Sequence, residues 1–397
     1  MRFVEVEEKN IFLVRARIGI FYLTMNWCGG GEFLTLVLSK ILRDEGFAVD
    51  LITTERCRWP SIERMLGIGR ESIDREYVIP PFVALPTIYS RFVYWLLRDA
   101  FSMLILKRRY DLTITTIQTF PIVFSDILYM HFPDFTADRL DRKGEQGLRR
   151  AYSLPYRVLC ELFVKGYKRI GTRPVIVTNS KYTQEAIKRI LCTEAVVVYP
   201  PVAVSRFQAL ERRKRRNIVL TISRIEEPKN LDILPQLASS VPEAQFVVVG
   251  AADRRSDIYL NRIIQEAKRL GVNDRVTIKL NCGEAEKENL LMQAKVYLHT
   301  MRNEHFGISI VEGMSAGLVP VVHKSGGPWF DILGATQGEF GYAYATIGEA
   351  AAFISEILRD EKLRTKLSKG AQQRAEYFDV SHFRDRMLAI VEPMLAA

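Results

Sequence analysis

Residues 296 to 322 constrain the fold more than any other part of the sequence. An apolar run at 296–300 leads to a glycine turn at Gly307, a helical pattern over 308–316 that ends at Gly317, and a second apolar run at 319–322. Two short apolar runs separated by a helix predict two buried strands of one parallel sheet, joined by that helix. The chain is therefore expected to contain an α/β domain.

The same alternation of strands, turns and helices extends through the chain. At 397 residues the chain is longer than one hydrophobic core usually covers, so two domains are expected. Pro200 and Pro201, followed by the charged run 211–216, mark a boundary between domains at 1–200 and 201–378. Further strands are expected at 17–22, 48–53, 113–116, 127–130, 175–180, 196–201, 217–222, 246–249 and 276–280.

The chain is basic, with a net charge of +10, which predicts attraction to nucleic acid, acidic lipid or a phosphorylated substrate. Its 48% hydrophobic and 26% charged residues are typical of a globular protein. Five scattered cysteines without a Cys-x-x-Cys pair indicate reduced side chains in a cytoplasmic protein and no metal site. No membrane-spanning helix is expected, because nowhere do 18 apolar residues follow one another.

Two glutamates, Glu304 and Glu312, flank the turn at Gly307. The start of the helix that follows presents unpaired N–H groups and a positive dipole end, which favour a bound diphosphate. Glu304 is then placed to accept the hydroxyls of a sugar, and Glu312 those of a ribose. A structural alternative stays open, because Ser309 and Glu312 have the Ser-x-x-Glu spacing of a capping box that only satisfies the helix start.

Three further groups of residues directly follow expected strands, where parallel sheets hold their ligands. The glycine run 29–31 lets the backbone approach a ligand, although a simple tight turn explains it equally well. His131 follows the strand at 127–130, and a structural histidine is the alternative there. Arg224 and Lys229 flank the turn after the strand at 217–222, where their charges can neutralise a diphosphate.

These motifs resemble the retaining glycosyltransferases of family 4, whose signature is two glutamates separated by seven residues, with Phe-Gly after the first. The match is specific over 303–331, moderate over 223–230 and 177–183, and weak before residue 110. The resemblance implies the GT-B architecture, in which two Rossmann-like, doubly wound domains face each other across a cleft. It also implies that a last helix, within 379–397, packs back on the first domain.

The resemblance further implies a role for each site residue. Arg224 and Lys229 stabilise the charge that develops on the leaving diphosphate, Glu304 orients the sugar, and His131 contacts it from the first domain. No cofactor and no protein-bound metal are implied, since the nucleotide sugar is the donor substrate. The residues expected to bind the donor are Gly29, Gly30, Gly31, His305, Phe306, Gly307, Ile308, Ser309 and Glu312.

Two stretches, 82–106 and 148–169, mix bulky apolar residues with basic ones. The pattern is typical of helices at a membrane interface and equally of packed helices with solvated faces. The residues expected to contact a membrane or an acceptor are Trp95, Leu96, Lys107, Arg108 and Arg109. Within family 4 the likeness is greatest to mannosyltransferases that extend a lipid-linked oligosaccharide. It implies GDP-mannose as donor, a lipid-linked saccharide as acceptor, and peripheral association with the cytoplasmic face of an anionic membrane.

Other functions stay open from the sequence. The donor is alternatively a UDP-sugar, and a sugar-nucleotide epimerase or hydrolase would share the fold. A nicotinamide-dependent dehydrogenase is disfavoured, because the glycine run lacks the complete dinucleotide fingerprint. A nucleic-acid-binding protein would explain the basic charge but not two carboxylates in its groove, so no nucleic-acid partner is expected.

Overall fold

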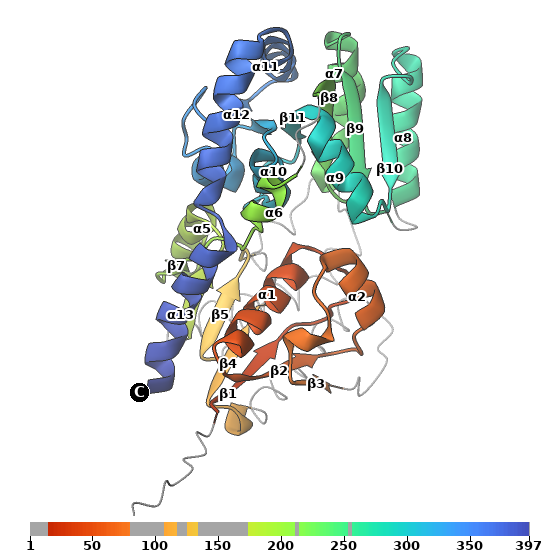
Figure 1. Cartoon of the computed structure of the whole chain (residues 1–397). Helices are drawn as coiled ribbons and strands as arrows, with labels where there is room; N and C mark the ends of the chain where they lie inside the picture. The colour runs from red at the N-terminus through yellow and green to blue at the C-terminus, as the bar shows by residue number, and fades with distance from the viewer. Residues whose placement is uncertain are drawn as a thin grey trace, which may run out of the picture.

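The computed structural model describes residues 15–79, 107–116, 125–133, 174–210, 214–252 and 256–396. These residues form two α/β domains, each built on a parallel sheet, with the second domain above the first in Figure 1. The architecture confirms the predicted fold class of two doubly wound domains. The stretches 82–106 and 148–169, including Trp95 and Leu96, lie outside the described residues.

The first sheet has the strand order β3-β2-β1-β4-β5-β6-β7, and neighbouring strands are parallel throughout. Its described helices are α1 (Gly30–Asp44), α2 (Trp59–Leu66) and α5 (Lys181–Leu191). The strand predicted at 196–201 was too long, because pairing ends after two residues and the chain then leaves the sheet. The strands are Arg17–Phe21, Ala48–Thr53, Arg75–Val78, Leu112–Thr115, Ile127–Met130, Val175–Thr178 and Val196–Val197, in order β1 to β7.

The second sheet has the order β10-β9-β8-β11-β12-β13, again with parallel neighbours. Its strands β8 to β13 are Arg216–Ile222, Gln245–Gly250, Val276–Leu280, Ala294–His299, Val319–His323 and Tyr342–Tyr344. Its helices α6 to α12 are Val204–Gln208, Leu234–Ser240, Ser256–Arg269, Glu284–Gln293, Ile308–Ser315, Ile347–Arg359 and Glu361–Glu376.

Successive residues of the central strands pack into opposite layers of the second domain. Val219 of β8 lies in one hydrophobic cluster with α7, α8 and α11, whereas Ile218 and Leu220 lie in another with α10 and α12. Helices therefore cover both faces of the sheet, which explains why these strands are continuous apolar runs rather than alternating ones.

The chain returns to the first domain at its end. After α12 it crosses back and forms α13 (Val380–Ala396), which lies beside the first domain in Figure 1. Phe383, Met387 and Val391 of this helix are buried in the core of the first domain, together with Ile18 and Tyr129. The first crossing, after β7, lies against this second one, and a parallel bridge joins Val202 to Asp379.

A close contact between α10 and β11 gives a test of this packing. A Cβ atom on Gly313 would lie 2.5 Å from Cδ2 of Tyr297. That ring cannot shift freely, because it is buried and its hydroxyl is hydrogen-bonded to Ser309 Oγ at 2.7 Å. We expect Gly313→Ala to lower the free energy of unfolding by about 1–3 kcal/mol, measured by chemical denaturation.

Gly348 provides the matched control, because it also lies in a helix but a Cβ there would come no closer than 3.9 Å to another atom. Gly348→Ala should be neutral or slightly stabilising, since alanine favours helix more than glycine does. Equal stability of Gly313→Ala and the parent chain would contradict the packing described for α10.

Candidate functional site

The candidate site lies where the chain reverses its winding direction in the second sheet. β8 and β11 are neighbours, and the chain leaves them towards opposite edges of the sheet. Lys229 follows β8, in a 3-10 turn at Glu227–Lys229, and Glu304 follows β11. Such points, beyond the carboxyl ends of the strands, are where open α/β sheets bind ligands. Two residues 75 positions apart in sequence are thus brought into contact.

Glu304 is an ionised carboxylate with both oxygens engaged. Oε2 lies 2.7 Å from Nζ of Lys229 and 3.5 Å from Nε2 of His299, while Oε1 accepts a hydrogen bond from the amide of His305 at 3.2 Å. Burial opposes its ionisation, but the charge of Lys229 and the hydrogen bond from His299 outweigh burial and hold the pKa of Glu304 well below its usual value. The site therefore keeps a fixed negative charge at neutral pH.

His299 is a site residue that the sequence analysis did not single out. It ends β11, is 5% exposed, and its Nδ1 is buried without a hydrogen-bond partner. Its other ring nitrogen, Nε2, is directed towards Oε2 of Glu304 and donates a hydrogen bond to that carboxylate. His299 thus orients Glu304 while Lys229 supplies the charge. Its place at the end of a buried strand was the available signal.

Arg224 is placed differently from Lys229. Its side chain is 63% exposed and pairs with Glu226 at 3.1 Å, within the same turn. Its charge also acts on Glu32 and Tyr22 of the first domain. Arg224 therefore points towards the opposite wall of the cleft, whereas the charge of Lys229 is largely balanced by Glu304.

The glycine run forms that opposite wall. Gly29 precedes α1, and its amide donates to Oε2 of Glu32 at 2.9 Å, while the hydroxyl of Tyr22 donates to Oε1 at 3.1 Å. A Cβ on Gly31 would lie 2.5 Å from the Tyr22 hydroxyl, so no side chain fits there. A Cβ on Gly30 would lie 3.1 Å from Cδ1 of Ile308 in the second domain. The run therefore faces the start of α10 directly.

His131 lies behind the glycine run, at the end of β5. It is buried, its Nε2 has no hydrogen-bond partner, and the Cβ position of Gly31 is 3.6 Å from that nitrogen. Burial, together with the charge of His305, lowers the pKa of His131 to about 4. The next residue, Phe132, stacks on His305 with ring centroids 4.2 Å apart. A neutral histidine with an open acceptor nitrogen thus lies where the two domains meet.

The capping box that the sequence left open as an alternative at the start of α10 is not formed. The helix begins at Ile308, with Gly307 before it in the left-handed conformation at φ 108°, and no side chain caps it. Ser309 instead donates its hydroxyl to the carbonyl of Ile222 at 3.2 Å and accepts from Tyr297 at 2.7 Å. The hydroxyl therefore fastens α10 to β8 and β11 and does not cap the amides of Ile308 and Ser309, whereas the amide of Ile310 donates to the carbonyl of Gly307 at 3.0 Å.

Glu312 pairs with a lysine that the sequence analysis did not identify. Its Oε2 lies 3.0 Å from Nζ of Lys287 on α9, and each side chain is only 16% exposed. Burial lowers the pKa of Lys287, but Glu312 and Glu284 outweigh it, and the net shift is upward. Lys287 therefore orients Glu312 from α9, and one carboxylate oxygen of Glu312 lies outside this pair.

The predicted donor-binding residues 305–307 serve different purposes. The side chain of Phe306 is 3% exposed and packs on Phe378 and Tyr199, so it offers a ligand its backbone only. The backbone of Glu304 and His305 is contacted closely by Gly326 and Gly327, and the amide of Gly327 donates to the carbonyl of Glu304 at 2.8 Å.

Asp331 connects this loop to the first domain. It accepts hydrogen bonds from the amides of Lys181 and Tyr182, at the start of α5, at 2.6 and 3.2 Å. It also accepts from the hydroxyl of Tyr199 at 3.0 Å. Burial raises the pKa of Asp331 although these hydrogen bonds favour the ionised form. A carboxylate from the second domain thus caps a helix of the first.

Of the residues expected to contact a membrane or an acceptor, the three that the structure describes are not brought to this site. Lys107, Arg108 and Arg109 precede β4 and so lie at the amino ends of the strands, opposite the cleft, where Lys107 pairs with Asp126 at 2.6 Å. Within the described ranges, every helix is too short or too polar to span a bilayer. The same ranges contain no group of three or more histidine, cysteine or acidic residues that could hold a metal ion.

Comparison with known proteins agrees with this geometry. Residues 205–374 match the family model of the glycosyl transferases group 1. The chain is similar to two proteins named GDP-Man:Man(3)GlcNAc(2)-PP-Dol alpha-1,2-mannosyltransferase. With that of Dictyostelium discoideum it is 28% identical over 314 residues, 70% of this chain and 62% of the relative, so it spans less than two thirds of that protein. With that of Neurospora crassa it is 27% identical over 465 residues, 96% of this chain and 80% of the relative.

The fold is similar to that of Anabaena Alr3699/HepE, solved in complex with UDP and glucose. The TM-score is 0.70 at 18% sequence identity, and the match covers 96% of this chain and 100% of that one. At this identity the similarity shows the fold alone, which is GT-B.

The buried His131 gives this site a pH dependence. The unfolded chain binds a proton on this residue as the pH falls below about 6.5, whereas the folded protein does so only near pH 4. Because the pKa of His131 is lower in the folded protein than in the unfolded chain, the free energy of unfolding decreases as the pH falls from about 6.5 to about 4. Between pH 7 and pH 5 we expect the parent chain to lose about 2 kcal/mol more unfolding free energy than His131→Gln does.

Chemical denaturation at both pH values measures this difference. Other groups titrate in both proteins and cancel in the comparison. His382→Gln, on the exposed surface of α13, is the control and should lose as much stability as the parent chain. The same loss in His131→Gln as in the parent would show that His131 is not held neutral.

Proposed function

We propose that this chain, in which residues 205–374 form a group 1 glycosyltransferase domain on a GT-B fold, is a retaining hexosyltransferase that uses a nucleotide-sugar donor. The contact between Lys229 and Glu304 carries this proposal. It places an ionised carboxylate and a cation 2.7 Å apart at the switch point of the second sheet. A carboxylate there accepts sugar hydroxyls, and the cation with the amides of α10 favours the adjacent diphosphate.

The diphosphate is stabilised mainly from two directions. Arg224 is exposed and reaches towards the first domain, so its guanidinium is available to phosphate oxygens once its contact with Glu226 is exchanged. The amides at the start of α10 lie opposite the glycine run, where Gly30 and Ile308 approach each other. Dipoles and cations that are already in place on both sides of the cleft stabilise the charge of a leaving group, because they need not rearrange during the reaction.

The reaction exchanges one bond of the sugar for another on the same face. The bond from the anomeric carbon to the diphosphate oxygen breaks, and a bond from that carbon to an acceptor hydroxyl forms. The leaving diphosphate oxygen takes the proton of the acceptor hydroxyl, so no separate base is required. Glu304 holds the sugar hydroxyls, the Nε2 acceptor of His131 contacts the sugar from the other wall, and Glu312 accepts the ribose hydroxyls.

Mannose from GDP-mannose is the donor we favour, because the relatives similar in sequence carry that donor in their names. Their names also give a dolichol-diphosphate oligosaccharide as acceptor, which supports a lipid-linked saccharide as the acceptor here. A net charge of +10 suits peripheral binding at the cytoplasmic face of an anionic membrane.

A UDP-sugar is the second candidate donor. The Anabaena structure of the same fold holds UDP and glucose. The sequence relatives and the structural relative thus support different donors.

Thermal unfolding against a panel of GDP-, UDP- and ADP-sugars tests the donor. A ligand at 100 times its Kd stabilises the folded state by about 2.7 kcal/mol, so Tm should rise by about 3 °C for the true donor. We expect the largest rise with GDP-mannose. A larger rise with a UDP-sugar would replace GDP-mannose, and no rise with any sugar nucleotide would contradict a donor site.

Two substitutions test the residues of the site. Glu304→Gln removes the charge that holds the sugar, and Lys229→Ala removes the cation beside the diphosphate. Each should lower the transfer rate by about 10²–10³-fold, the usual effect of losing one preorganised electrostatic contact. The assay follows transfer of labelled sugar to a lipid-linked saccharide, and water as the only acceptor identifies hydrolysis.

Lys188→Ala is the control, because Lys188 is an exposed lysine of the first domain that pairs with Glu194. It should leave transfer unchanged. Parent-like rates in both site variants would contradict the assignment of Glu304 and Lys229. The proposed membrane association is tested by presenting the acceptor in anionic and in neutral vesicles. It requires faster transfer on the anionic vesicles.

A further inference from the structure

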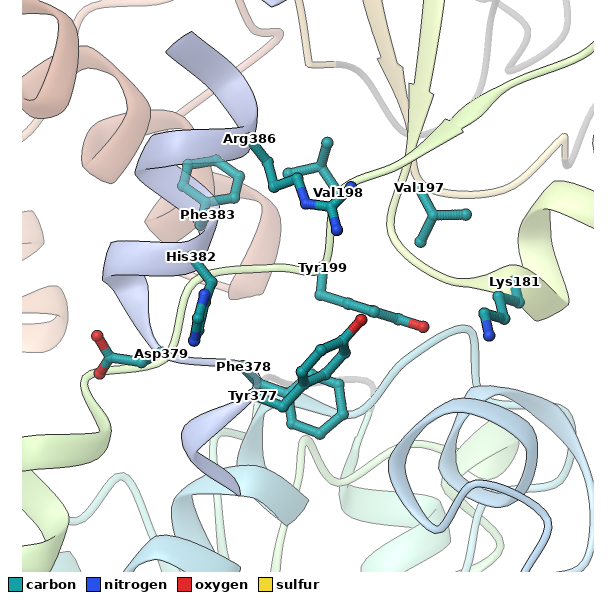
Figure 2. Close-up of a pocket in the computed structure, with 10 residues that line it drawn as sticks. All are labelled: Lys181, Val197, Val198, Tyr199, Tyr377, Phe378, Asp379, His382, Phe383 and Arg386. Atoms are coloured by element: carbon teal, nitrogen blue, oxygen red, sulfur yellow. The ribbon is translucent and has the colours of Figure 1, made fainter. Parts of the chain in front are cut away.

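A pocket of about 180 Å³ lies at the hinge between the domains, and Phe306 of the donor loop packs on two of its lining residues, Tyr199 and Phe378. Figure 2 shows that its walls come from both segments in which the chain crosses between domains: Tyr199 belongs to the first crossing, and Tyr377 and Asp379 to the second. Lys181, at the start of α5, and Arg386, on α13, complete the walls. A molecule bound here touches both connecting segments at once.

The two crossings form one unit. The amide of Val202 donates to the carbonyl of Phe378 at 3.2 Å, and the amide of Val380 donates to the carbonyl of Val202 at 3.0 Å. Backbone torsions that change the angle between the domains are concentrated in such connecting segments. The pocket therefore opens onto the part of the chain that moves when the cleft opens or closes.

Two basic side chains, Lys181 and Arg386, and one carboxylate, Asp379, line the pocket, so its lining has a net positive charge. Lys181 and Arg386 form no ion pair with any residue that the structure describes, whereas nearby Arg384 pairs with Glu45. The carboxylate of Asp379 accepts hydrogen bonds from the amide and hydroxyl of Ser381 at 3.0 and 2.8 Å, which hold it towards Ser381 but do not cancel its charge. The lining thus favours an anionic ligand.

Aromatic rings provide the remaining walls. The rings of Tyr199 and Tyr377 lie edge to face with centroids 5.7 Å apart, and His382 lies 6.1 Å from Tyr377. Tyr377 is 47% exposed although it is a large aromatic side chain, and Arg374 lies over its ring, 5.1 Å from the centroid. Rings beside two cations suit a molecule that joins a phosphate to a flat or ring-shaped body.

The pocket is connected to the donor loop. The hydroxyl of Tyr199 donates to Asp331 at 3.0 Å, and Asp331 lies in the short helix Pro328–Ile332. This helix follows Gly327, whose amide holds the carbonyl of Glu304. A ligand that fixes Tyr199 therefore acts on the site through one hydrogen bond and one short helix.

We propose that this hinge pocket binds a small phosphorylated molecule, with the phosphate held by Lys181 and Arg386, and that the bound molecule fixes the angle between the domains. The first part of the proposal, binding, is argued from the pocket alone. The second part, the effect of the bound molecule on the donor site, rests on the proposed function.

Isothermal titration of the full chain tests the binding. The probes are inorganic phosphate, pyrophosphate and glucose 6-phosphate, with glucose as the uncharged comparison. A saturating nucleoside diphosphate is present throughout to occupy the donor site. We expect saturable binding of glucose 6-phosphate with a Kd of about 1 mM or tighter, and weaker binding of the two inorganic anions, which lack the ring.

The double variant Lys181→Gln, Arg386→Gln should weaken this binding by about tenfold or more, because both charge-assisted contacts are lost. Its matched control, Lys188→Gln, Arg189→Gln, removes two exposed positive charges from α5 outside the pocket and should bind as the parent does. The proposal is overturned if no probe saturates, or if the two double variants bind equally.

The effect of the pocket on the donor site is tested by measuring donor affinity with and without glucose 6-phosphate. We expect that affinity to change in the parent chain and not in the pocket variant. Binding at the pocket with unchanged donor affinity refutes the hinge effect alone. Failure of donor binding itself, with pocket binding intact, refutes the proposed function instead.

Discussion

The ion pair between Lys229 and Glu304 is the interaction on which the candidate site depends. A carboxylate and an ammonium that are each only 16% exposed need one another, because either group alone loses hydration without compensation. The pair also fixes two turns: the hydroxyl of Thr300 donates to the carbonyl of Lys229 at 2.6 Å, and Nδ2 of Asn230 donates to the carbonyl of Thr300 at 3.3 Å. The floor of the cleft is therefore assembled before any ligand arrives.

Most of the fold followed from the sequence because its central strands are buried on both faces. Such strands are continuous apolar runs and stand out, as at 217–222 and 296–300. Two strands were not predicted. β3, Arg75–Val78, is a sheet edge with charged and half-exposed residues, and β13, Tyr342–Tyr344, has three residues only. Their pairing is decided by the neighbouring strand rather than by their own pattern.

The candidate site was predictable in part, because residues that directly follow strands are identified by position. Glu304, Lys229 and His131 belong to this class. Contacts between distant segments gave no such signal: Lys287 reaches Glu312 from another helix, and Asp331 reaches the first domain. The Ser309 spacing left a cap open as an alternative because it is ambiguous by itself. The helix starts at Gly307 instead, and Tyr297 and Ile222 engage the hydroxyl.

The cap that Asp331 places on α5 has a consequence for the motion of the two domains. Separating them would strip two backbone amides and one phenol from a buried carboxylate, and would also unstack Phe132 from His305. Each lost partner leaves a polar group that must be resolvated before the cleft stands open. These contacts between the domains therefore oppose opening of the cleft. They slow the release of a bound molecule independently of the affinity of the cleft for that molecule.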